Sequence, residues 1–442
     1  MNKKMKRLLI IIMLASLIIP LSAQLILVKA HPDAGDTWST PETISLVHSD
    51  FGYFGKSLVI DEQNNVHVVY ASYTDETGHW EIFYVTNKTG EWTQTQISDL
   101  GAYGYQYEPS IALDSYGLLH VMWSIYTGGG KTNIFYTNNS NNHWNPAFNV
   151  SNAINADGGG VRFAIDLDNI VHAIYLEGGN AYYINRTYTG VWSTPKPLFT
   201  PPYTITNAQV ADIAVSSNGK IYLVVKASNG SEFEYLNNVY SFDGVSAPPV
   251  RVTSYIGDSS GLALTADRND HAHLVYNYED IIGQALIYRY YNGSAWGQDE
   301  VILNATVDGI DYIYTPSIGC DYDNNPHIAF ITETDTIDLK YTNKTQGTWG
   351  TPVLVAGGDE DFDASATQIF IDRQGYAHII FDFWPGTSEV VIRYTHTTEP
   401  VGSAWPTPPP TTGDLTLYVI IVGIATAAVI AGSVAFYMLK KR

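Results

Sequence analysis

The sequence of 442 residues predicts an all-β fold in which short strands form seven similar four-stranded units. Three observations support this prediction: a polar turn recurs seven times at even spacing, four strand-like segments surround each turn, and the first such segment is out of phase with the repeat. Repeats of about fifty residues with four strands each are typical of radial β architectures.

The recurring turn begins with Asp and ends six residues later with His. Its copies are DEQNNVHVVY, DSYGLLHVMW, DLDNIVHAIY, SSNGKIYLVV, DRNDHAHLVY, DYDNNPHIAF and DRQGYAHIIF, starting at Asp61, Asp114, Asp166, Ser216, Asp267, Asp321 and Asp372. Successive copies start 53, 52, 50, 51, 54 and 51 residues apart. We predict that the Asp accepts N–H bonds within its own turn, that Asn or Gly takes the left-handed dihedral angles, and that the His bridges to the turn.

Four strands are expected in each unit. One apolar strand precedes the Asp turn and one follows it; a third carries a Tyr before a polar turn ending in Trp, as in IFYVTNKTGEW, and the fourth follows the Trp. The segment TWSTPETIS, residues 37–45, is a fourth strand with no unit before it. We expect it to complete the seventh unit and close the ring, which removes a sheet edge. The predicted fold class is a seven-bladed β-propeller of four antiparallel strands per blade, over residues 37–405.

The repeat resembles those of bacterial and archaeal surface β-propellers of the broad sialidase-like (BNR) and NHL-type group. The resemblance covers about residues 37–405 and implies the fold rather than an activity. In sialidases the Asp box, Ser-x-Asp-x-Gly-x-x-Trp, lies in a late turn of the blade, whereas here the Asp turn joins the first two strands. A sialidase site needs three converging arginines, and Arg268 and Arg373 lie in the far turns, so sialidase activity is not expected.

The two ends of the chain predict a single-pass protein of the cell membrane. Residues 1–30 combine basic residues, an apolar run and small-residue exits, which is typical of a secretory signal peptide. Residues 406–414 form a Pro/Thr-rich stalk, and residues 415–439 form an apolar run long enough to span a bilayer as a helix. The basic residues 440–442 should stay in the cytoplasm, which places the ectodomain outside.

Charge, cysteine usage and sequons agree with an exterior location. Without the seven basic residues at the two ends, 16 Lys and Arg remain against 44 Asp and Glu, a formal charge of about −28 that disfavours nucleic acid as a partner. Cys320 is the only cysteine, so no intrachain disulfide can form. Candidate glycosylation sites are the eight N-x-[ST] sequons at Asn87, Asn138, Asn149, Asn185, Asn229, Asn292, Asn304 and Asn343.

Period-two alternation along the first strands predicts a mostly polar ring of side chains at one mouth of the central channel. The ring positions are Ser57, Ser110, Arg162, Asp212, Ala263, Ser317 and Gln368. Arg162 and Asp212 lie in consecutive blades, so we expect them to be neighbours that could pair. A structural ion pair is the alternative to a ligand anchor.

The loops at this mouth, which lead into the first strands and join the second to the third, are aromatic and acidic. We call this side the mouth face and the opposite side the turn face. Candidate ligand-binding residues of the mouth face are Tyr53, Tyr105, Tyr107, Glu108, Arg162, Asp212, Asp258, Asp311, Tyr312, Tyr314 and Asp361. Tyrosines could stack on sugars and carboxylates could accept from sugar hydroxyls; the alternative is solvated loops with tyrosines packed between blades.

No catalytic residue, metal site or cofactor is assigned, although a structural calcium ion stays open. Asp321, Asp323 and His327 look like a cation loop, but Asp323 is matched only by Asp168, and a ligand set would not be diluted in this way. The leading interpretation is a binding or adhesion module for a glycan, a peptide or another surface protein. The alternatives are a glycoside hydrolase or lyase that uses carboxylates at the channel mouth, and a structural cell-envelope protein.

Overall fold

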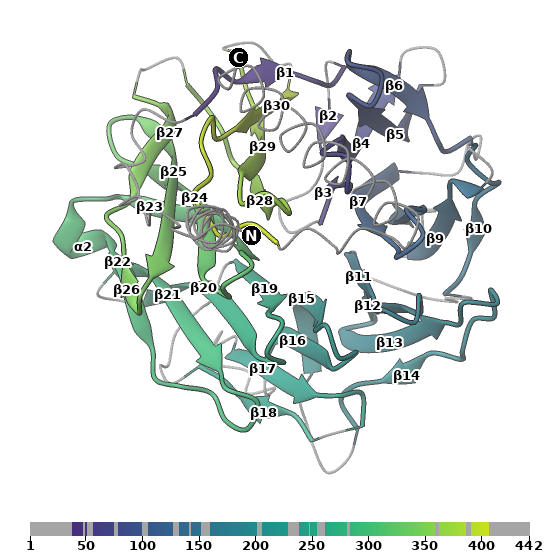
Figure 1. The fold of residues 1–442 in the computed structure, drawn as a ribbon. Helices are drawn as coiled ribbons and strands as arrows, with labels where there is room; N and C mark the ends of the chain where they lie inside the picture. The colour runs from purple at the N-terminus through teal and green to yellow at the C-terminus, as the bar shows by residue number, and fades with distance from the viewer. Residues whose placement is uncertain are drawn as a thin grey trace, which may run out of the picture. The chain divides into compact units, whose positions relative to one another are not determined.

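The structure is a computed structural model. It describes residues 38–46, 49–50, 56–74, 78–99, 105–126, 132–140, 143–151, 160–200, 206–228, 238–246, 248–253, 261–280, 283–358, 362–385 and 390–405. The chain divides into two compact units, Met1–Ser403 and Ala404–Arg442, and the fold given below is that of the first. This unit consists of seven antiparallel sheets that follow one another around a ring, so the predicted seven-bladed propeller is confirmed (Figure 1).

The blades follow the chain in order. Blades 1 and 2 contain β2 (Ser49–Asp50), β3 (Leu58–Ile60), β4 (Val66–Thr74), β5 (His79–Thr86) and β6 (Thr93–Gln96), then β7 (Tyr105–Leu113), β8 (Leu119–Tyr126), β9 (Thr132–Asn138) and β10 (Phe148–Asn149). Blades 3 and 4 contain β11 (Val161–Ile165), β12 (Val171–Glu177), β13 (Asn180–Arg186) and β14 (Lys196–Pro197), then β15 (Thr206–Val215), β16 (Ile221–Ser228), β17 (Asn238–Asp243) and β18 (Val250–Arg251).

The remaining three blades include the one that joins the two ends of the propeller. Blades 5 and 6 contain β19 (Leu262–Ala266), β20 (Ala272–Asp280), β21 (Gly283–Tyr291) and β22 (Glu300–Asn304), then β23 (Tyr312–Cys320), β24 (Pro326–Glu333), β25 (Ile337–Thr345), β26 (Thr348–Trp349) and β27 (Val353–Gly357). Blade 7 contains β28 (Thr367–Ile371), β29 (Ala377–Phe383), β30 (Val391–His396) and β1 (Glu42–Thr43). A short helix that the sequence did not predict, α2 (Ala305–Asp308), follows β22 and is capped by the side chain of Asn304.

The N-terminal strand closes the ring, as predicted. β1 pairs with β30 in the register Glu42↔Tyr394 and Thr43↔Arg393, and Trp38 extends the pairing through a bridge to Thr397. The inner strands contact one another in the order β3, β7, β11, β15, β19, β23, β28 and back to β3. Closure therefore covers the outer edge of β30 with the first strand of the same chain.

The repeated turn is structural, as the sequence indicated. In blade 1, Oδ1 of Asp61 accepts from the N–H groups of Gln63 and Asn65 at 2.9 and 2.8 Å. Its Oδ2 lies 3.2 Å from Nε2 of His67, whose Nδ1 lies 2.6 Å from the hydroxyl of Tyr84. The same Asp, His and Tyr arrangement recurs in Asp114–His120–Tyr136, Asp166–His172–Tyr183, Asp267–His273–Tyr288, Asp321–His327–Tyr341 and Asp372–His378–Tyr394.

The left-handed position of these turns follows the expectation except in one blade. It is taken by Asn64, Gly117, Asn169, Gly219, Asp270, Asn324 and Gly375, all with φ between 60° and 87°. Blade 5 thus uses Asp270 where Asn or Gly was expected. Its side chain accepts from Ser216 Oγ of the preceding blade at 2.6 Å, which supplies the reason for a carboxylate at this position.

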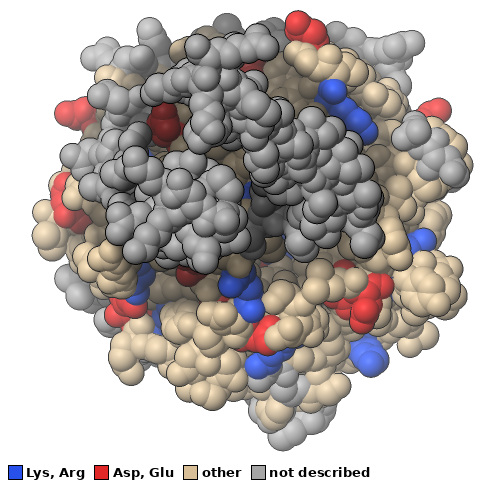
Figure 2. Space-filling model, viewed as in Figure 1, with Lys and Arg blue, Asp and Glu red and all other residues tan. Residues whose placement is uncertain are grey.

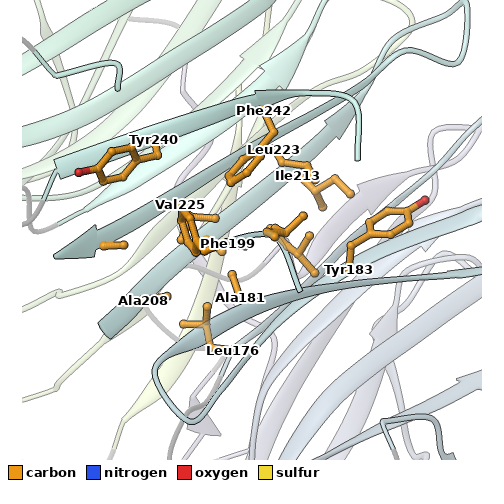
Figure 3. Packing of buried hydrophobic residues seen from close by; sticks show 14 residues of the cluster. Leu176, Ala181, Tyr183, Phe199, Ala208, Ile213, Leu223, Val225, Tyr240 and Phe242 are labelled. Carbon is orange, nitrogen blue, oxygen red and sulfur yellow. The ribbon is translucent and has the colours of Figure 1, made fainter. Parts of the chain in front are cut away.

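The recurring Trp packs on the recurring Tyr of the neighbouring blade. The ring centroids are 5.0–5.4 Å apart with edge-on geometry in the pairs Trp144–Tyr84, Trp192–Tyr136, Trp349–Tyr288, Trp38–Tyr341 and Trp92–Tyr394. Aliphatic and aromatic side chains fill the space between blades. Figure 3 shows one such cluster, in which Leu176 and Tyr183 of blade 3 pack with Ile213, Leu223 and Phe242 of blade 4.

Several sequence predictions fall on parts of the chain that the structure does not describe. They are the signal peptide (residues 1–30), the stalk (406–414), the membrane helix (415–439) and the basic tail (440–442). Among the residues that are described, no helix is both long and apolar enough to cross a membrane.

Candidate functional site

Two blades begin with the same motif on the mouth face. YQYEPSI in blade 2 and YIYTPSI in blade 6 both contain a β-bulge, seen as register shifts between Tyr107 and Ser110 and between Tyr314 and Ser317. The bulge places Glu108 at φ 50° and Thr315 at φ 34°, which is uncommon for residues other than glycine. Bulges re-aim the neighbouring side chains, and in both blades the first tyrosine of the motif is exposed.

Four aromatic residues lie close together where blades 1 and 2 meet on the mouth face. The ring centroid of Trp80 lies 6.4 Å from that of Tyr73 and 6.2 Å from that of Tyr105. Tyr126 is the cross-strand partner of Tyr105. Tyr73, Tyr105 and Tyr126 are 39%, 60% and 40% exposed. We call Tyr73, Trp80, Tyr105 and Tyr126 the aromatic platform.

The residues that flank the platform in sequence are buried and polar. Glu81 is 1% exposed and accepts from Ser98 Oγ at 2.5 Å and from Gln106 Nε2 at 2.7 Å. Burial raises the pKa of Glu81, although the two hydrogen bonds lower it in part. Because Glu81 and Gln106 adjoin Trp80 and Tyr105 in the chain, their hydrogen bond ties blade 1 to blade 2 and fixes the spacing of the platform.

The corresponding tyrosines of blade 6 are surrounded by polar groups. Tyr312 is 47% exposed, and its ring stacks on Tyr314 with centroids 5.9 Å apart and planes at 19°. The Tyr314 hydroxyl donates to Glu333. Burial, with the Glu333 carboxylate second, raises the pKa of Tyr314 well above its usual value. The predicted residue Asp311 is exposed beside Tyr312.

The charged residues of the channel mouth pair differently from the expectation. The Lys56 ammonium lies 3.1 Å from Asp212 Oδ1 and donates to the carbonyl oxygens of Leu264, at 3.1 Å, and Ile213. Arg162, 3% exposed, lies 3.8 Å from Glu108. The predicted pairing of Arg162 with Asp212 is therefore replaced by two other ion pairs, because Lys56 extends from blade 1 to blades 4 and 5 and takes the Asp212 carboxylate.

The two partners at the mouth have shifted pKa values. Burial raises the pKa of Glu108, although the charge of Arg162 opposes this shift. Burial lowers the pKa of Arg162, although the carboxylates of Glu108 and Asp212 favour its charged form. Asp212 is fixed further by the backbone N–H groups of Ile213 and Leu264, both at 2.7 Å.

The other polar residues of the ring hold blades together. Ser57 Oγ donates to the Pro109 carbonyl at 2.6 Å, and Ser57 N–H donates to Gln368 Oε1 at 2.5 Å. Ser317 Oγ accepts from the N–H of Ile369 at 3.0 Å. These contacts join successive blades, so this part of the predicted ring has a structural role.

The predicted site residues thus separate into three groups. Tyr105, Tyr312 and Asp311 are exposed on the mouth face, whereas Tyr107 is half-buried with its hydroxyl 3.2 Å from that of Thr132. Glu108, Arg162 and Asp212 form the ion pairs of the mouth. Tyr53, Asp258 and Asp361 lie outside the described residues.

Sequence reasoning missed Tyr73, Trp80, Tyr126 and Lys56. Tyr73 and Trp80 face each other across the loop that joins the second and third strands of blade 1, and an aromatic residue on each side of such a loop was a usable signal. Lys56 directly precedes the ring position Ser57. Within the described ranges, no group of three or more His, Cys, Asp and Glu residues is placed to hold a metal ion.

Charge on the side of the molecule drawn in Figure 2 is mixed. Lys and Arg lie among Asp and Glu there, and the coloured atoms show no large patch of one sign. Of the sequons, Asn149 and Asn292 are exposed, whereas the side-chain amides of Asn138 and Asn343 donate to Tyr136 Oη and to the Val401 carbonyl. Asn87, Asn185 and Asn304 are half-buried, and Asn229 lies outside the described ranges. Glycosylation stays a prediction for all eight.

No protein-family model matches the chain, and no curated protein is similar to it in sequence. Three solved structures are similar in fold. A PL25 ulvan lyase bound to -[GlcA(1-4)Rha3S]- has a TM-score of 0.55 at 14% identity, covering 82% of this chain and 99% of the lyase chain. A protein of unknown function from Dyadobacter fermentans has a TM-score of 0.50 at 12% identity, covering 83% of this chain and 99% of its own.

The third structure, the NanB sialidase from Streptococcus pneumoniae, has a TM-score of 0.41 at 9% identity, covering 81% of this chain and 69% of the sialidase chain. Identities this low show similarity of fold alone. The chain is a seven-bladed β-propeller whose structural neighbours include glycan-active enzymes.

Proposed function

We propose that this protein is a glycan-binding module and that its ligand stacks on the aromatic platform of the mouth face. The observation that carries the proposal is the contact of Trp80 with both Tyr73 and Tyr105, whose rings are 39% and 60% exposed. Soluble proteins seldom leave several large rings in contact and open to solvent without a binding role. The C–H face of a sugar ring is a natural partner for such rings, since aromatic side chains combine an apolar face with polar edges.

Two further features support a glycan over a peptide or a protein surface. The platform is small and is fixed from below by the hydrogen bond between Glu81 and Gln106. The solved structure of similar fold with the higher TM-score is described as a polysaccharide lyase bound to a sugar chain. A peptide or another surface protein is the competing ligand of the same platform.

A glycan array probed with the purified full-length protein tests the proposal, followed by titration of the best binder. Trp80→Ala should weaken binding at least about tenfold, because a stacked aromatic contact contributes about 1 kcal/mol or more. Tyr188→Ala is the control, since Tyr188 is 74% exposed in a turn of blade 3 remote from the platform in sequence. Undiminished glycan binding by Trp80→Ala, or binding of peptides alone, would refute the proposal.

Glycan cleavage at the channel mouth is a second candidate. It is favoured by Glu108, a carboxyl of raised pKa that lies 3.8 Å from the buried Arg162. A general acid needs such a raised pKa. Glu108→Gln should then abolish release of unsaturated or reducing sugar ends while leaving binding at the platform intact. Wild-type protein that binds a glycan without shortening it would eliminate this candidate.

We also propose that residues 415–439 anchor the protein in the cell membrane, with the propeller outside and residues 440–442 in the cytoplasm. The length and apolar character of this run support the proposal. Removal of residues 415–442 should move the protein from the membrane fraction to the soluble fraction after cell lysis. Continued membrane sedimentation of the shortened chain would contradict it.

A further inference from the structure

We infer that the mouth face carries a second glycan site, centred on Tyr312 of blade 6, and that the protein is therefore bivalent. The inference rests on the proposed function of the aromatic platform and extends it to another part of the ring. Blades 2 and 6 are separated by blades 1 and 7 on one side and by blades 3, 4 and 5 on the other.

The backbone supplies the first argument. YQYEPSI and YIYTPSI occupy the same place in their blades, start the inner strand and contain the same bulge. Both bulges put a residue other than glycine at positive φ directly before a proline, Glu108 at 50° and Thr315 at 34°. This conformation is unfavourable for both residues, so the fold accepts the same cost twice to present this segment.

The side chains supply the second argument. In both blades the first tyrosine is exposed, Tyr105 at 60% and Tyr312 at 47%. In both blades the hydroxyl of the second tyrosine has a hydrogen-bond partner, Thr132 for Tyr107 and Glu333 for Tyr314. The second tyrosine thus fixes the segment, and the first offers a ring to solvent.

The flanks of the two sites differ, and the difference defines the ligand. Trp80 lies four residues before the turn-bridging Tyr84, and Gln284 lies four before Tyr288; Tyr73 lies six residues after His67, and Glu279 lies six after His273. Blade 5 therefore presents an amide and a carboxylate where blade 1 presents two rings. Gln284 Nε2 donates to Glu279 at 3.1 Å, and Gln284 Oε1 accepts from the N–H of Ile313 at 2.9 Å, directly beside Tyr312.

One tyrosine face edged by carboxylates suits a neutral sugar. The ring of Tyr312 can stack on the sugar, and Asp311, Glu333 and Glu279 supply acceptors for its hydroxyl groups. The same three carboxylates disfavour uronic acids and sulfated sugars by charge repulsion. Two such sites on one rigid ring would bind a long or surface-bound glycan with avidity beyond that of either site.

Calorimetric titration of the full-length protein with neutral cello-, manno-, xylo- and galacto-oligosaccharides tests the inference. We expect two sites per chain. Tyr312→Ala should leave one site, Tyr105→Ala should leave the other, and the double variant should leave none. Tyr116→Ala, an 80% exposed tyrosine in an Asp turn of the turn face, is the control and should keep both. Glucuronate-containing oligosaccharides should bind the Tyr312 site at least about tenfold more weakly than neutral ones.

A stoichiometry of one that Tyr105→Ala abolishes and Tyr312→Ala leaves unchanged would overturn the second site while preserving the proposed function. Absence of any glycan binding by wild-type protein would overturn both. Thermal melting of each variant shows whether it is folded. If Tyr312→Ala fails to fold, Tyr312→Ser in the Tyr105→Ala background decides the question, and retention of the remaining site there would overturn the inference.

Discussion

Nε2 of His273 lies 3.2 Å from Oδ2 of Asp267, and both side chains are buried. Burial disfavours the imidazolium form and lowers the pKa of His273, although Asp267 opposes this. Burial alone would raise the pKa of Asp267, but hydrogen bonds from His273 and from backbone N–H groups outweigh it and lower the pKa. The same directions hold for His67 with Asp61 and for His378 with Asp372.

These shifts predict a propeller that loses stability in mild acid. A histidine whose folded pKa lies below its unfolded value of about 6.5 favours folding above that pH, and this contribution falls as pH decreases below it. The lowered Asp values act in the same direction at lower pH. We expect the free energy of unfolding to fall by about 1–3 kcal/mol between pH 7.5 and pH 5.5, measured by denaturant titration.

A variant isolates the histidine contribution. His378→Gln removes one titrating ring, so its stability at pH 7.5 should be lower but its change with pH should be smaller than that of the wild type. Besides Asp372 and Tyr394, the ring of His378 faces His396, which lowers its pKa further. Equal stability at pH 7.5 and pH 5.5 would contradict the prediction.

Gly375 predicts a second stability effect. It lies in the Asp turn of blade 7 at φ 87°, and its carbonyl accepts from the N–H groups of Val401 and Gly402 at 2.9 and 3.0 Å. A Cβ on Gly375 would lie 2.2 Å from the Gly402 carbonyl oxygen. Gly375→Ala should therefore displace residues 401–403 and destabilise by more than about 2 kcal/mol, the upper end of the cost of left-handed geometry alone.

Gly117 is the matched control, because it holds the same turn position in blade 2 at φ 78° with nothing within 4 Å of an added Cβ. Gly117→Ala should cost only the dihedral strain of about 1–2 kcal/mol. Thermal and denaturant unfolding of the two variants measure the difference. Equal losses of stability would show that the contact with Gly402 contributes nothing.

The sequence was sufficient to predict the fold because the repeat encodes contacts that lie within or between adjacent blades. Asp61 and His67 are six residues apart, so their bond is a local consequence of the turn. Trp144 packs on Tyr84 of the preceding blade, and every such pair repeats with the period of the chain. Even the closure by β1 followed from a strand that had no unit of its own.

The site was predicted only in part, because its contacts cross the ring or depend on a bulge. Alternation correctly put Arg162 and Asp212 at the mouth, but Lys56 reaches Asp212 from a blade that is not adjacent, and no local pattern reveals such a contact. Tyr105 and Tyr107 are two residues apart, yet one is exposed and the other is fixed through Thr132. The exposure of each tyrosine depends on the register of the bulge, which the spacing in sequence does not give.

Ring closure predicts a third effect. Trp38 bridges to Thr397 and packs edge-on against Tyr341 with centroids 5.4 Å apart. Trp38→Ala should destabilise the protein by about 2–4 kcal/mol, because the side chain is half-buried at the junction of blades 6 and 7. Limited proteolysis should then release the N-terminal strand first. Tyr188→Ala serves as the exposed control, and unchanged stability of Trp38→Ala would contradict a role in closure.

The ion pair between Lys56 and Asp212 predicts the fourth effect. Lys56→Met keeps most of the side-chain length but removes the ammonium, leaving the buried Asp212 carboxylate with only the N–H groups of Ile213 and Leu264. The lysine is about a third exposed, so we expect a loss of about 1–3 kcal/mol, less than for a fully buried pair. Lys88→Met, at an exposed position, is the matched control.

Asp212→Asn, alone and combined with Lys56→Met, completes a double-mutant cycle measured by denaturant unfolding. If the two side chains stabilise each other across the channel, the double variant should be more stable than the sum of the single losses predicts, by about 0.5 kcal/mol or more. Glycan binding at the aromatic platform should not change in any of these variants, because the pair lies at the channel and the platform lies between blades 1 and 2. Strictly additive losses would show that the contact contributes no coupling energy, and a parallel loss of glycan binding would move the ligand site from the platform to the channel mouth.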